Sequence, residues 1–143
     1  SVLLRLALGF LGIIRSRPRH GLVVGEVKLD RVTQYLGFHL ALGDYPLLQL
    51  LEARVPTEAL EIWRHHRDAI QLVITDVVMP EMTGPHLVEH LRSQRPEVKV
   101  LYMSGHASEE VLDPKALDSR AAFLAKPFSP ARLATQVRQL LET

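Results

Sequence analysis

Several polar side chains stand directly after short apolar runs of the sequence. In chain order they are Glu26, Asp76, Ser104 and Lys126, which supply two carboxylates, a hydroxyl and an ammonium group. The carboxyl ends of parallel strands share one edge of a sheet, and ligands of open α/β folds bind at that edge. If each apolar run is such a strand, these four side chains converge at one site.

This set of groups suits phosphoryl transfer. Mg²⁺ takes oxygen ligands and is commonly held by one or two carboxylates together with phosphate oxygens and water. A lysine and a hydroxyl can bind the oxygens of an incoming phosphoryl group, while a remaining carboxylate oxygen attacks it in line. Taken singly, strand-end Asp and Ser residues are most often turn formers. The prediction of an aspartyl phosphate therefore depends on their joint placement.

The elements that would position these residues follow from the alternation of apolar runs and helical segments after residue 20. This alternation is typical of βα units around a parallel sheet. The runs are continuously apolar, as expected for strands covered by helices on both faces. The predicted strands are Leu22–Val24, Leu47–Leu51, Leu72–Thr75, Val98–Met103 and Ala121–Ala125. The sequence predicts an α/β fold with a doubly wound, five-stranded parallel sheet and five helices.

Capping residues and prolines mark where the helices should begin. We expect helix starts at Thr57, at Gly84-Pro85, at Ser108 and at Ser129-Pro130. Pro114 should cut the third of these short, and the last should continue to the end of the chain.

Length and charge limit what the chain can be. Its 143 residues suffice for one domain with a buried core, and the absence of cysteine excludes disulfides, thiol catalysis and Cys-ligated metals. Residues 1–20 carry four arginines and no acid, whereas residues 21–143 carry 13 basic and 16 acidic side chains, a net charge of −3. This mildly acidic bulk argues against a nucleic-acid-binding core. No phosphate-binding glycine motif of the nucleotide-binding folds occurs.

The first twenty residues form an apolar and basic extension. The apolar run Val2–Ile14 is shorter than the roughly 20 residues that span a bilayer, and it contains Arg5. Leu3, Leu6 and Phe10 would share one face of a helix, so we predict a short amphipathic helix that packs locally or contacts a membrane surface or a partner.

Three segments together resemble the receiver domains of two-component response regulators (CheY-like). Thr75-Asp76-Val77-Val78-Met79-Pro80-Glu81-Met82-Thr83-Gly84 is similar to the phosphoacceptor segment of that family. Tyr102-Met103-Ser104-Gly105 and Phe123-Leu124-Ala125-Lys126-Pro127-Phe128 resemble its later motifs, in the family's order and at similar spacing. The residues of these motifs are most similar to those of receivers attached to hybrid sensor histidine kinases.

The resemblance implies a role for each matching residue. Asp76 would be the phosphoacceptor, Ser104 the switch hydroxyl, Phe123 the aromatic switch residue and Lys126 the partner of the phosphoryl group. Mg²⁺ would be held by Asp76, Glu26 and the backbone carbonyl of Val78. The family also implies the flavodoxin-like strand order 2-1-3-4-5 and a cis peptide bond between Lys126 and Pro127.

The end of the first predicted strand departs from the family pattern. Receivers normally carry two adjacent acids there, and this chain has Gly25-Glu26. We therefore predict weakened Mg²⁺ binding, and a second interpretation stays open: a pseudo-receiver that binds proteins through the same surface without phosphorylation.

A rival motif lies in the segment His86-Leu87-Val88-Glu89-His90. It fits the H-x-x-E-H pattern of zinc peptidases, with His86, Glu89 and His90 as the functional residues. Leu87, Val88 and Leu91 would have to pack on the same helix, and no convincing third ligand follows before residue 143. Two solvated histidines are the simpler interpretation.

From these observations we expect a receiver in residues 21–143 preceded by the extension 1–20. It would be a self-modifying switch rather than an enzyme. Its expected partners are a histidine kinase or phosphotransfer protein, a downstream protein and, in some states, a second copy of itself. It would act in the cytoplasm, without nucleic acid, and would contact a membrane only through residues 1–20.

Overall fold

A five-stranded parallel sheet forms the centre of the protein. The computed structural model describes residues 19–25, 48–105 and 111–142, and the strand order is β2-β1-β3-β4-β5. In chain order the elements are β1 (Arg19–Val24), β2 (Leu48–Ala53), α3 (Pro56–His66), β3 (Ile70–Asp76), α4 (Gly84–Gln94), β4 (Lys99–Ser104), the 3-10 helix η2 (Pro114–Ala116), β5 (Ala121–Ala125) and α5 (Pro130–Glu142). The predicted α/β class and strand order are confirmed.

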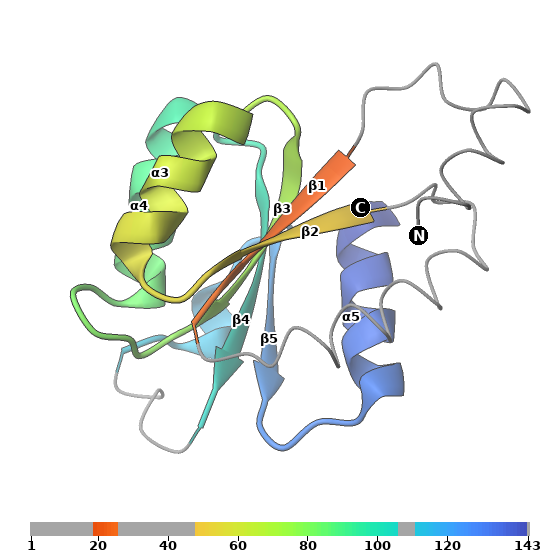
Figure 1. The fold of residues 1–143 in the computed structure, drawn as a ribbon. Coiled ribbons are helices and arrows are strands. Elements are labelled where there is room, and N and C mark those ends of the chain that lie inside the picture. The colour runs from red at the N-terminus through yellow and green to blue at the C-terminus, as the bar shows by residue number, and fades with distance from the viewer. Residues whose placement is uncertain (1–18, 26–47, 106–110, 143) are drawn as a thin grey trace, which may run out of the picture.

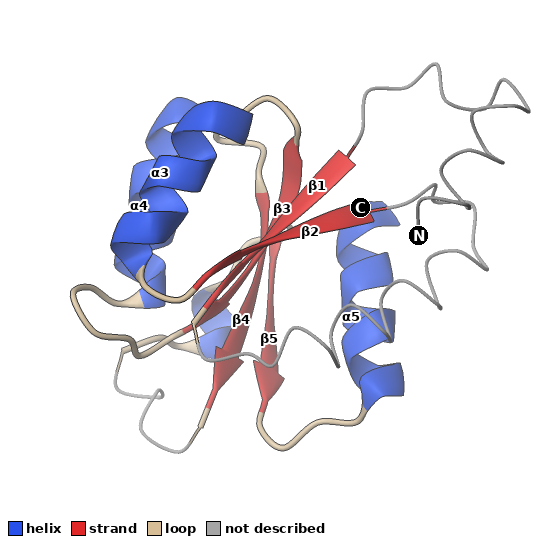
Figure 2. Ribbon diagram, viewed as in Figure 1, coloured by secondary structure: helices blue, strands red, loops and turns tan. Residues whose placement is uncertain are grey.

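Helices cover both faces of the sheet. α3 and α4 lie on one face and α5 on the other (Figures 1 and 2). Two hydrophobic clusters fill the layers between. The α3–α4 core includes Leu22, Val73, Leu87 and Trp63, and the α5 core includes Val23, Leu72, Ile74, Leu133 and Val137. Adjacent buried residues such as Leu22 and Val23, or Val73 and Ile74, face opposite cores, which explains the continuous apolar runs inside the strands.

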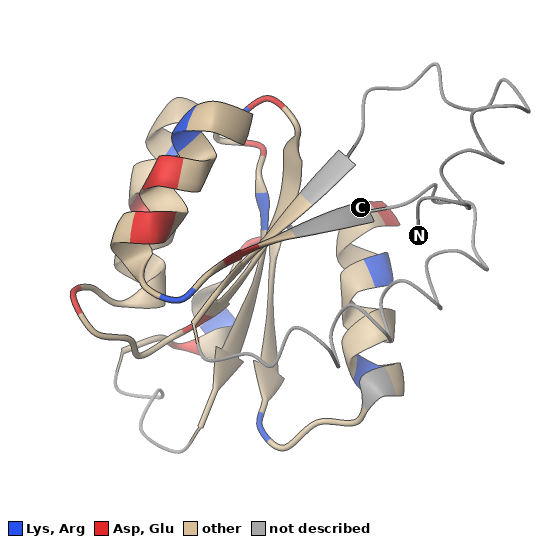
Figure 3. Cartoon of the chain, in the orientation of Figure 1, with Lys and Arg blue, Asp and Glu red and all other residues tan. Residues whose placement is uncertain are grey.

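Charged residues lie mainly outside this double core. Most described Lys, Arg, Asp and Glu residues belong to helices and loops, while β2, β3 and β4 carry Glu52, Asp76 and Lys99 (Figure 3). Asp76 is an exception, since it belongs to β3 and is only 9% exposed. A carboxylate buried at a strand end needs partners, and those partners define the site described below.

Two arginines at the C-terminal end of α4 donate hydrogen bonds to backbone carbonyls near the amino ends of three strands. Arg92 donates from Nε and Nη2 to the Val98 carbonyl, both at 3.3 Å, and from Nη2 to the Arg120 carbonyl at 3.2 Å. Arg95 donates from Nη1 to the Ile70 carbonyl at 2.6 Å. These bonds give donor partners to carbonyls at the start of β3 and just before β4 and β5, and the Arg120 carbonyl also accepts from the Val100 N–H at 2.9 Å.

Several strand boundaries differ from the prediction. Pairing continues past the apolar runs into polar residues at the ends of β3 and β4, where Asp76 pairs in register with Met103 and Ser104 with Ala125. β4 begins at Lys99 rather than at the expected Val98, and β5 has the predicted bounds. α3 begins at Pro56, one residue before the expected Thr57, because proline suits a first helical turn. α4 and α5 begin where predicted.

Some expectations fall on residues outside the described part of the chain. They are the helix in residues 2–14, the metal ligand Glu26, the helix expected after β1 and the start of the helix expected at Ser108. Within 111–120 the described helical segment is η2, which starts at Pro114. None of the helices in the described ranges is long and apolar enough to cross a membrane.

Candidate functional site

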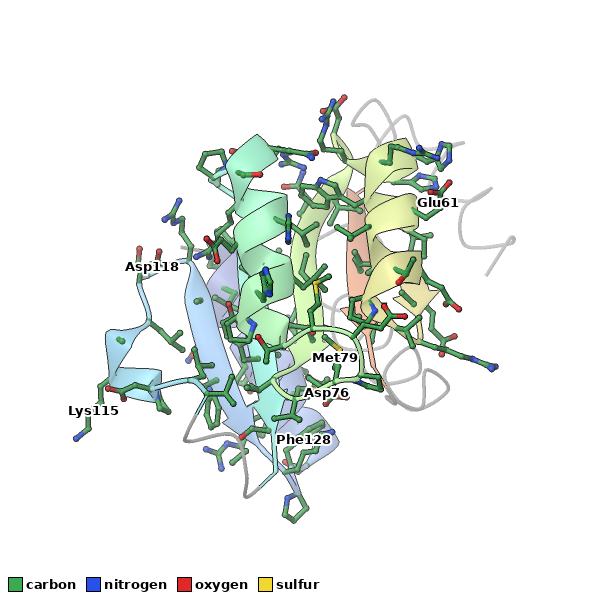
Figure 4. All side chains as sticks on the ribbon, turned by 90° about the vertical axis from the view of Figure 1, so that its left-hand side faces the viewer. Glu61, Asp76, Met79, Lys115, Asp118 and Phe128 are labelled. Carbon is green, nitrogen blue, oxygen red and sulfur yellow. The ribbon has the colours of Figure 1, made fainter. Side chains whose placement is uncertain are left out.

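The predicted site residues meet at the carboxyl edge of the sheet. β3 ends in Asp76, the neighbouring β4 ends in Ser104, and Lys126 directly follows β5. The backbone N–H of Lys126 donates to the Ser104 carbonyl at 2.8 Å, and the N–H of Val77 donates to the Met103 carbonyl at 3.0 Å. These bonds continue the ladder past the strand ends, so they hold the three side chains at one edge. Figure 4 shows Asp76 in this region, below the labelled Met79.

An ion pair joins the two charged members of the site. Lys126 Nζ lies 2.6 Å from Asp76 Oδ1, and the two side chains are 41% and 13% exposed. The second carboxylate oxygen, Oδ2, accepts no hydrogen bond from the residues that the structure describes. Asp76 therefore has one neutralised oxygen and one oxygen open to a further partner.

Gly25 approaches this open oxygen from the end of β1. Its φ is +112°, and a Cβ built on it would lie 2.3 Å from Asp76 Oδ2. Its N–H donates to the Ala53 carbonyl at 3.0 Å, which fixes the backbone in that place. Only glycine fits a left-handed backbone against a carboxylate at this distance. From the sequence pattern alone, Gly25 is interpreted as a missing acid, although a glycine at a strand end is itself a signal of close backbone approach.

The loop after Asp76 is held by its ends. The Gly84 N–H donates to the Val77 carbonyl at 2.7 Å, and a Cβ on Gly84 would lie 2.3 Å from the Asp76 carbonyl oxygen. Val77 is fully buried, whereas Val78 is 55% exposed, and the Val78 carbonyl accepts no hydrogen bond from any described residue. The loop therefore contains, two residues after Asp76, a backbone oxygen that has no hydrogen-bond donor among the described residues.

Ser104 and Phe123 occupy the positions that the family resemblance implies for a switch. Ser104 is 5% exposed at the end of β4. Phe123 is half-buried on β5, pairs in register with the buried Tyr102 and packs against the α3–α4 core. The Lys126–Pro127 peptide bond is cis, as predicted.

Two oxygen atoms at and after the end of β3 are of the chemical kind that Mg²⁺ prefers. They are Asp76 Oδ2 and the Val78 carbonyl oxygen, neither of which accepts a hydrogen bond from a described residue. Mg²⁺ usually keeps several waters and needs only one or two carboxylates, so one described carboxylate with a backbone carbonyl suits it. Glu26, the predicted second carboxylate, lies outside the described residues.

The rival histidine motif does not assemble a metal site. The rings of His86 and His90 stack on α4 with centroids 5.2 Å apart, and both residues, like Glu89, are exposed. No group of three or more His, Cys, Asp or Glu residues that could hold a metal occurs within the described ranges. Leu87, Val88 and Leu91 are buried, so α4 uses this segment for packing.

Comparison with known proteins agrees with this geometry. Residues 30–138 match the response regulator receiver domain family. The sensor kinase CckA of Brucella abortus (strain 2308) is 42% identical over 91 residues, which cover 64% of this chain and 10% of the kinase. The chain thus spans only a small part of that relative.

Solved structures show the same fold. The receiver domain of a hybrid histidine kinase CckA superposes with a TM-score of 0.59 at 28% identity, covering 85% of this chain and 98% of that one. The signal receiver domain of an HD domain-containing protein from Pseudomonas fluorescens Pf-5 reaches a TM-score of 0.71 at 25% identity, covering 88% and 96%. Given its strand order, its site and a family match over most of its length, the chain belongs to the response regulator receiver domains of two-component signalling.

Proposed function

We propose that the chain is a phosphoacceptor switch and that Asp76 is the residue phosphorylated. The observation that carries this proposal is the 2.6 Å pair between Lys126 Nζ and Asp76 Oδ1, which leaves Oδ2 without a described partner. The ion pair with Lys126 orients the carboxylate, and the open oxygen is free to act as a nucleophile.

In the proposed step, Asp76 Oδ2 attacks the phosphorus of a phosphohistidine on a histidine kinase or phosphotransfer protein. An O–P bond forms and the N–P bond breaks, and the leaving imidazole keeps the electron pair and takes up a proton from water. Lys126 and the Ser104 hydroxyl bind the phosphoryl oxygens and so stabilise their charge. The products are an aspartyl phosphate and a neutral histidine.

We assign Mg²⁺ as the cofactor, held by Asp76, the Val78 carbonyl and Glu26. When bound, it would neutralise the charge that builds up as a carboxylate and a phosphoryl group approach each other. Water at this half-open edge would then hydrolyse the aspartyl phosphate. The chain therefore modifies and resets itself, without an external turnover substrate.

The conformational change on phosphorylation would begin at Ser104 and then involve Phe123. A phosphoryl group on Asp76 offers new acceptor oxygens to the Ser104 hydroxyl, and movement of Ser104 lets the half-buried Phe123 ring pack further inward. A local charge thereby biases a two-state surface around β5. A downstream protein, or a second copy of the chain, would read that surface.

The likeness to CckA favours a receiver that works within a hybrid kinase or beside one. We assign residues 21–143 to this receiver and leave residues 1–20 as a separate extension, the one part expected to reach a membrane. Because the phosphodonor is made by an ATP-dependent kinase, we expect the domain to act in the cytoplasm.

Acetyl phosphate with Mg²⁺ tests the proposal directly. The mass of the intact chain should show one added phosphoryl group on the wild type and none on Asp76→Asn. Lys126→Ala should reduce the adduct strongly, whereas Lys115→Ala, which removes an exposed lysine on η2, should not. A wild type that stays unmodified would contradict the phosphoacceptor role.

Gly25 supports a second candidate, the pseudo-receiver. Its backbone occupies the place where receivers carry the first of two acids, and so it reduces the number of metal ligands. If the chain is a pseudo-receiver, the wild type and Asp76→Asn should bind the protein partner with equal affinity. Neither protein should take up phosphate.

A further inference from the structure

The first turn of α3 is capped by a residue from a distant loop. The helix has Val55 at its N-cap, and that side chain makes no capping hydrogen bond. Instead, Glu81 Oε2 accepts from the Thr57 N–H at 3.1 Å and also from the Thr57 hydroxyl. Glu81 lies 24 residues further along the chain, in the loop between β3 and α4, which passes beside the first turn of α3 (Figure 1). A carboxylate at this helix end is doubly favourable, since it satisfies an open N–H and complements the helix dipole.

The backbone at Glu81 is strained to make this contact. Its φ is +70°, and it is the one described residue other than glycine with a positive φ. The Met82 N–H donates to the Pro80 carbonyl at 2.9 Å across it, which makes Glu81 the centre of a γ-turn of the rare, positive-φ form. Backbone strain persists only where surrounding contacts hold it, and the Thr57 hydrogen bonds are such contacts.

The strained turn belongs to the loop that carries Val78. The ends of this loop are fixed at Asp76 and Gly84, and Met79 and Met82 pack partly into the α3–α4 core. Among the described residues, the Glu81–Thr57 contact supplies the only hydrogen bonds between this loop and α3. This contact therefore ties the loop that contains Val78 to the first turn of α3.

We propose that Glu81 is a positioning residue for the metal-dependent phosphorylation of Asp76. By clamping the 77–83 loop to α3, it holds the Val78 carbonyl where Mg²⁺ can use it. This inference rests on the proposed function, but it concerns metal affinity, which can be measured without phosphorylation.

If Glu81 had a purely structural role, its substitution would change the stability of the protein but not its Mg²⁺ affinity. The test therefore needs variants that separate an effect on stability from an effect on Mg²⁺ binding. Glu81→Ala removes the carboxylate and keeps the strained φ. Glu81→Gly removes the carboxylate and relieves the strain, so it should fold at least as well as Glu81→Ala. Glu81→Gln keeps an acceptor oxygen for Thr57, and Glu89→Ala removes an exposed glutamate of α4 as the control.

Mg²⁺ binding by calorimetry is the first readout. Supporting residues around metal ligands typically contribute about tenfold or more to affinity. We expect Glu81→Ala and Glu81→Gly to bind Mg²⁺ more weakly, with a dissociation constant about tenfold higher than that of the wild type. Glu81→Gln should lie close to the wild type, and Glu89→Ala should match it. Unchanged affinity in Glu81→Gly, or no Mg²⁺ binding by the wild type, would overturn the inference.

Phosphorylation by acetyl phosphate across a range of Mg²⁺ concentrations is the second readout. Glu81→Gly should need more Mg²⁺ for half-maximal modification and should approach the wild-type rate once Mg²⁺ saturates. A wild type that binds Mg²⁺ but takes no phosphate would refute the proposed function and leave the calorimetric test standing. A wild type that is phosphorylated with the same Mg²⁺ dependence as Glu81→Gly would refute the role of Glu81 alone.

Discussion

At the scale of single residues, Gly25 is a position where no side chain fits. Gly25→Ala would put a Cβ 2.3 Å from Asp76 Oδ2 on a backbone with φ of +112°. The left-handed backbone alone costs about 1–2 kcal/mol, and relief of the clash adds to it. We expect a lower free energy of unfolding by at least this amount in urea denaturation. Gly105→Ala is the matched control, because a Cβ there meets nothing within 4 Å, and it should change stability by less than about 0.5 kcal/mol.

Tyr102 makes stability sensitive to alkaline pH. Burial raises the pKa of its hydroxyl, with the Arg92 charge opposing this shift and the Asp118 charge adding to it. A raised folded pKa means that the unfolded chain ionises first, so stability is full below about pH 10 and falls as the pH rises further. Between neutral pH and about pH 11, the urea midpoint of the Tyr102→Phe protein should fall less than that of the wild type. Parallel losses in both proteins would contradict this assignment.

The sequence predicts that Asp76, Ser104 and Lys126 lie at one edge of the sheet, but it does not predict the contacts that Gly25 and Glu81 make there. Asp76, Ser104 and Lys126 each end an apolar run, a pattern that can be read along the chain. The roles of Gly25 and Glu81 depend on contacts with residues 51 and 24 positions away, and on backbone angles that residue type alone does not reveal. Gly25 was read only as a missing acid, and Glu81 was not singled out.

At the scale of elements, the C-terminal turn of α4 is tied to the sheet by Arg92. Its half-buried guanidinium serves the carbonyls of Val98 and Arg120 and lies 3.5 Å from the Asp118 carboxylate. Arg92→Ala removes both side-chain donors from the Val98 carbonyl and one of two donors from the Arg120 carbonyl, which keeps the Val100 N–H. We expect a loss of about 1–3 kcal/mol in unfolding free energy. Arg92→Lys should recover little, because an ammonium group lacks the planar fork that reaches two carbonyls.

Arg132→Ala is the control for this experiment. Arg132 is exposed on α5, and no side-chain hydrogen bond or ion pair joins it to the described residues. Its loss should stay within about 0.5 kcal/mol. An Arg92→Ala protein as stable as Arg132→Ala would show that water replaces the lost donors.

Element types were easier to predict than element ends. Continuous apolar runs and prolines identified all five strands and the starts of α4 and α5. The ends were displaced because hydrogen-bonded pairing, rather than burial, terminates a strand, and pairing extends to Asp76 and Ser104. Hydrophobicity carries no information about that last polar pair.

At the scale of the whole molecule, two separate cores flank one sheet, so the chain should unfold as a unit while each core is perturbed independently. Ile70 belongs to the α3–α4 core and Ile74 to the α5 core, and both are fully buried on β3. Ile70→Val and Ile74→Val should each cost about 0.5–1.5 kcal/mol. Because the two side chains face different clusters, the double variant should lose the sum to within about 0.5 kcal/mol.

Urea denaturation of the four proteins followed by both circular dichroism and Trp63 fluorescence checks this expectation. Trp63 reports on the α3–α4 core, whereas circular dichroism reports on the whole chain. Coincident transitions with additive losses would establish one cooperative unit with two independent packing layers. If the Trp63 fluorescence transition shifted for Ile70→Val but not for Ile74→Val, the two packing layers would unfold separately. A conformational change that begins at Asp76 could then reach both layers only through the strands of the sheet.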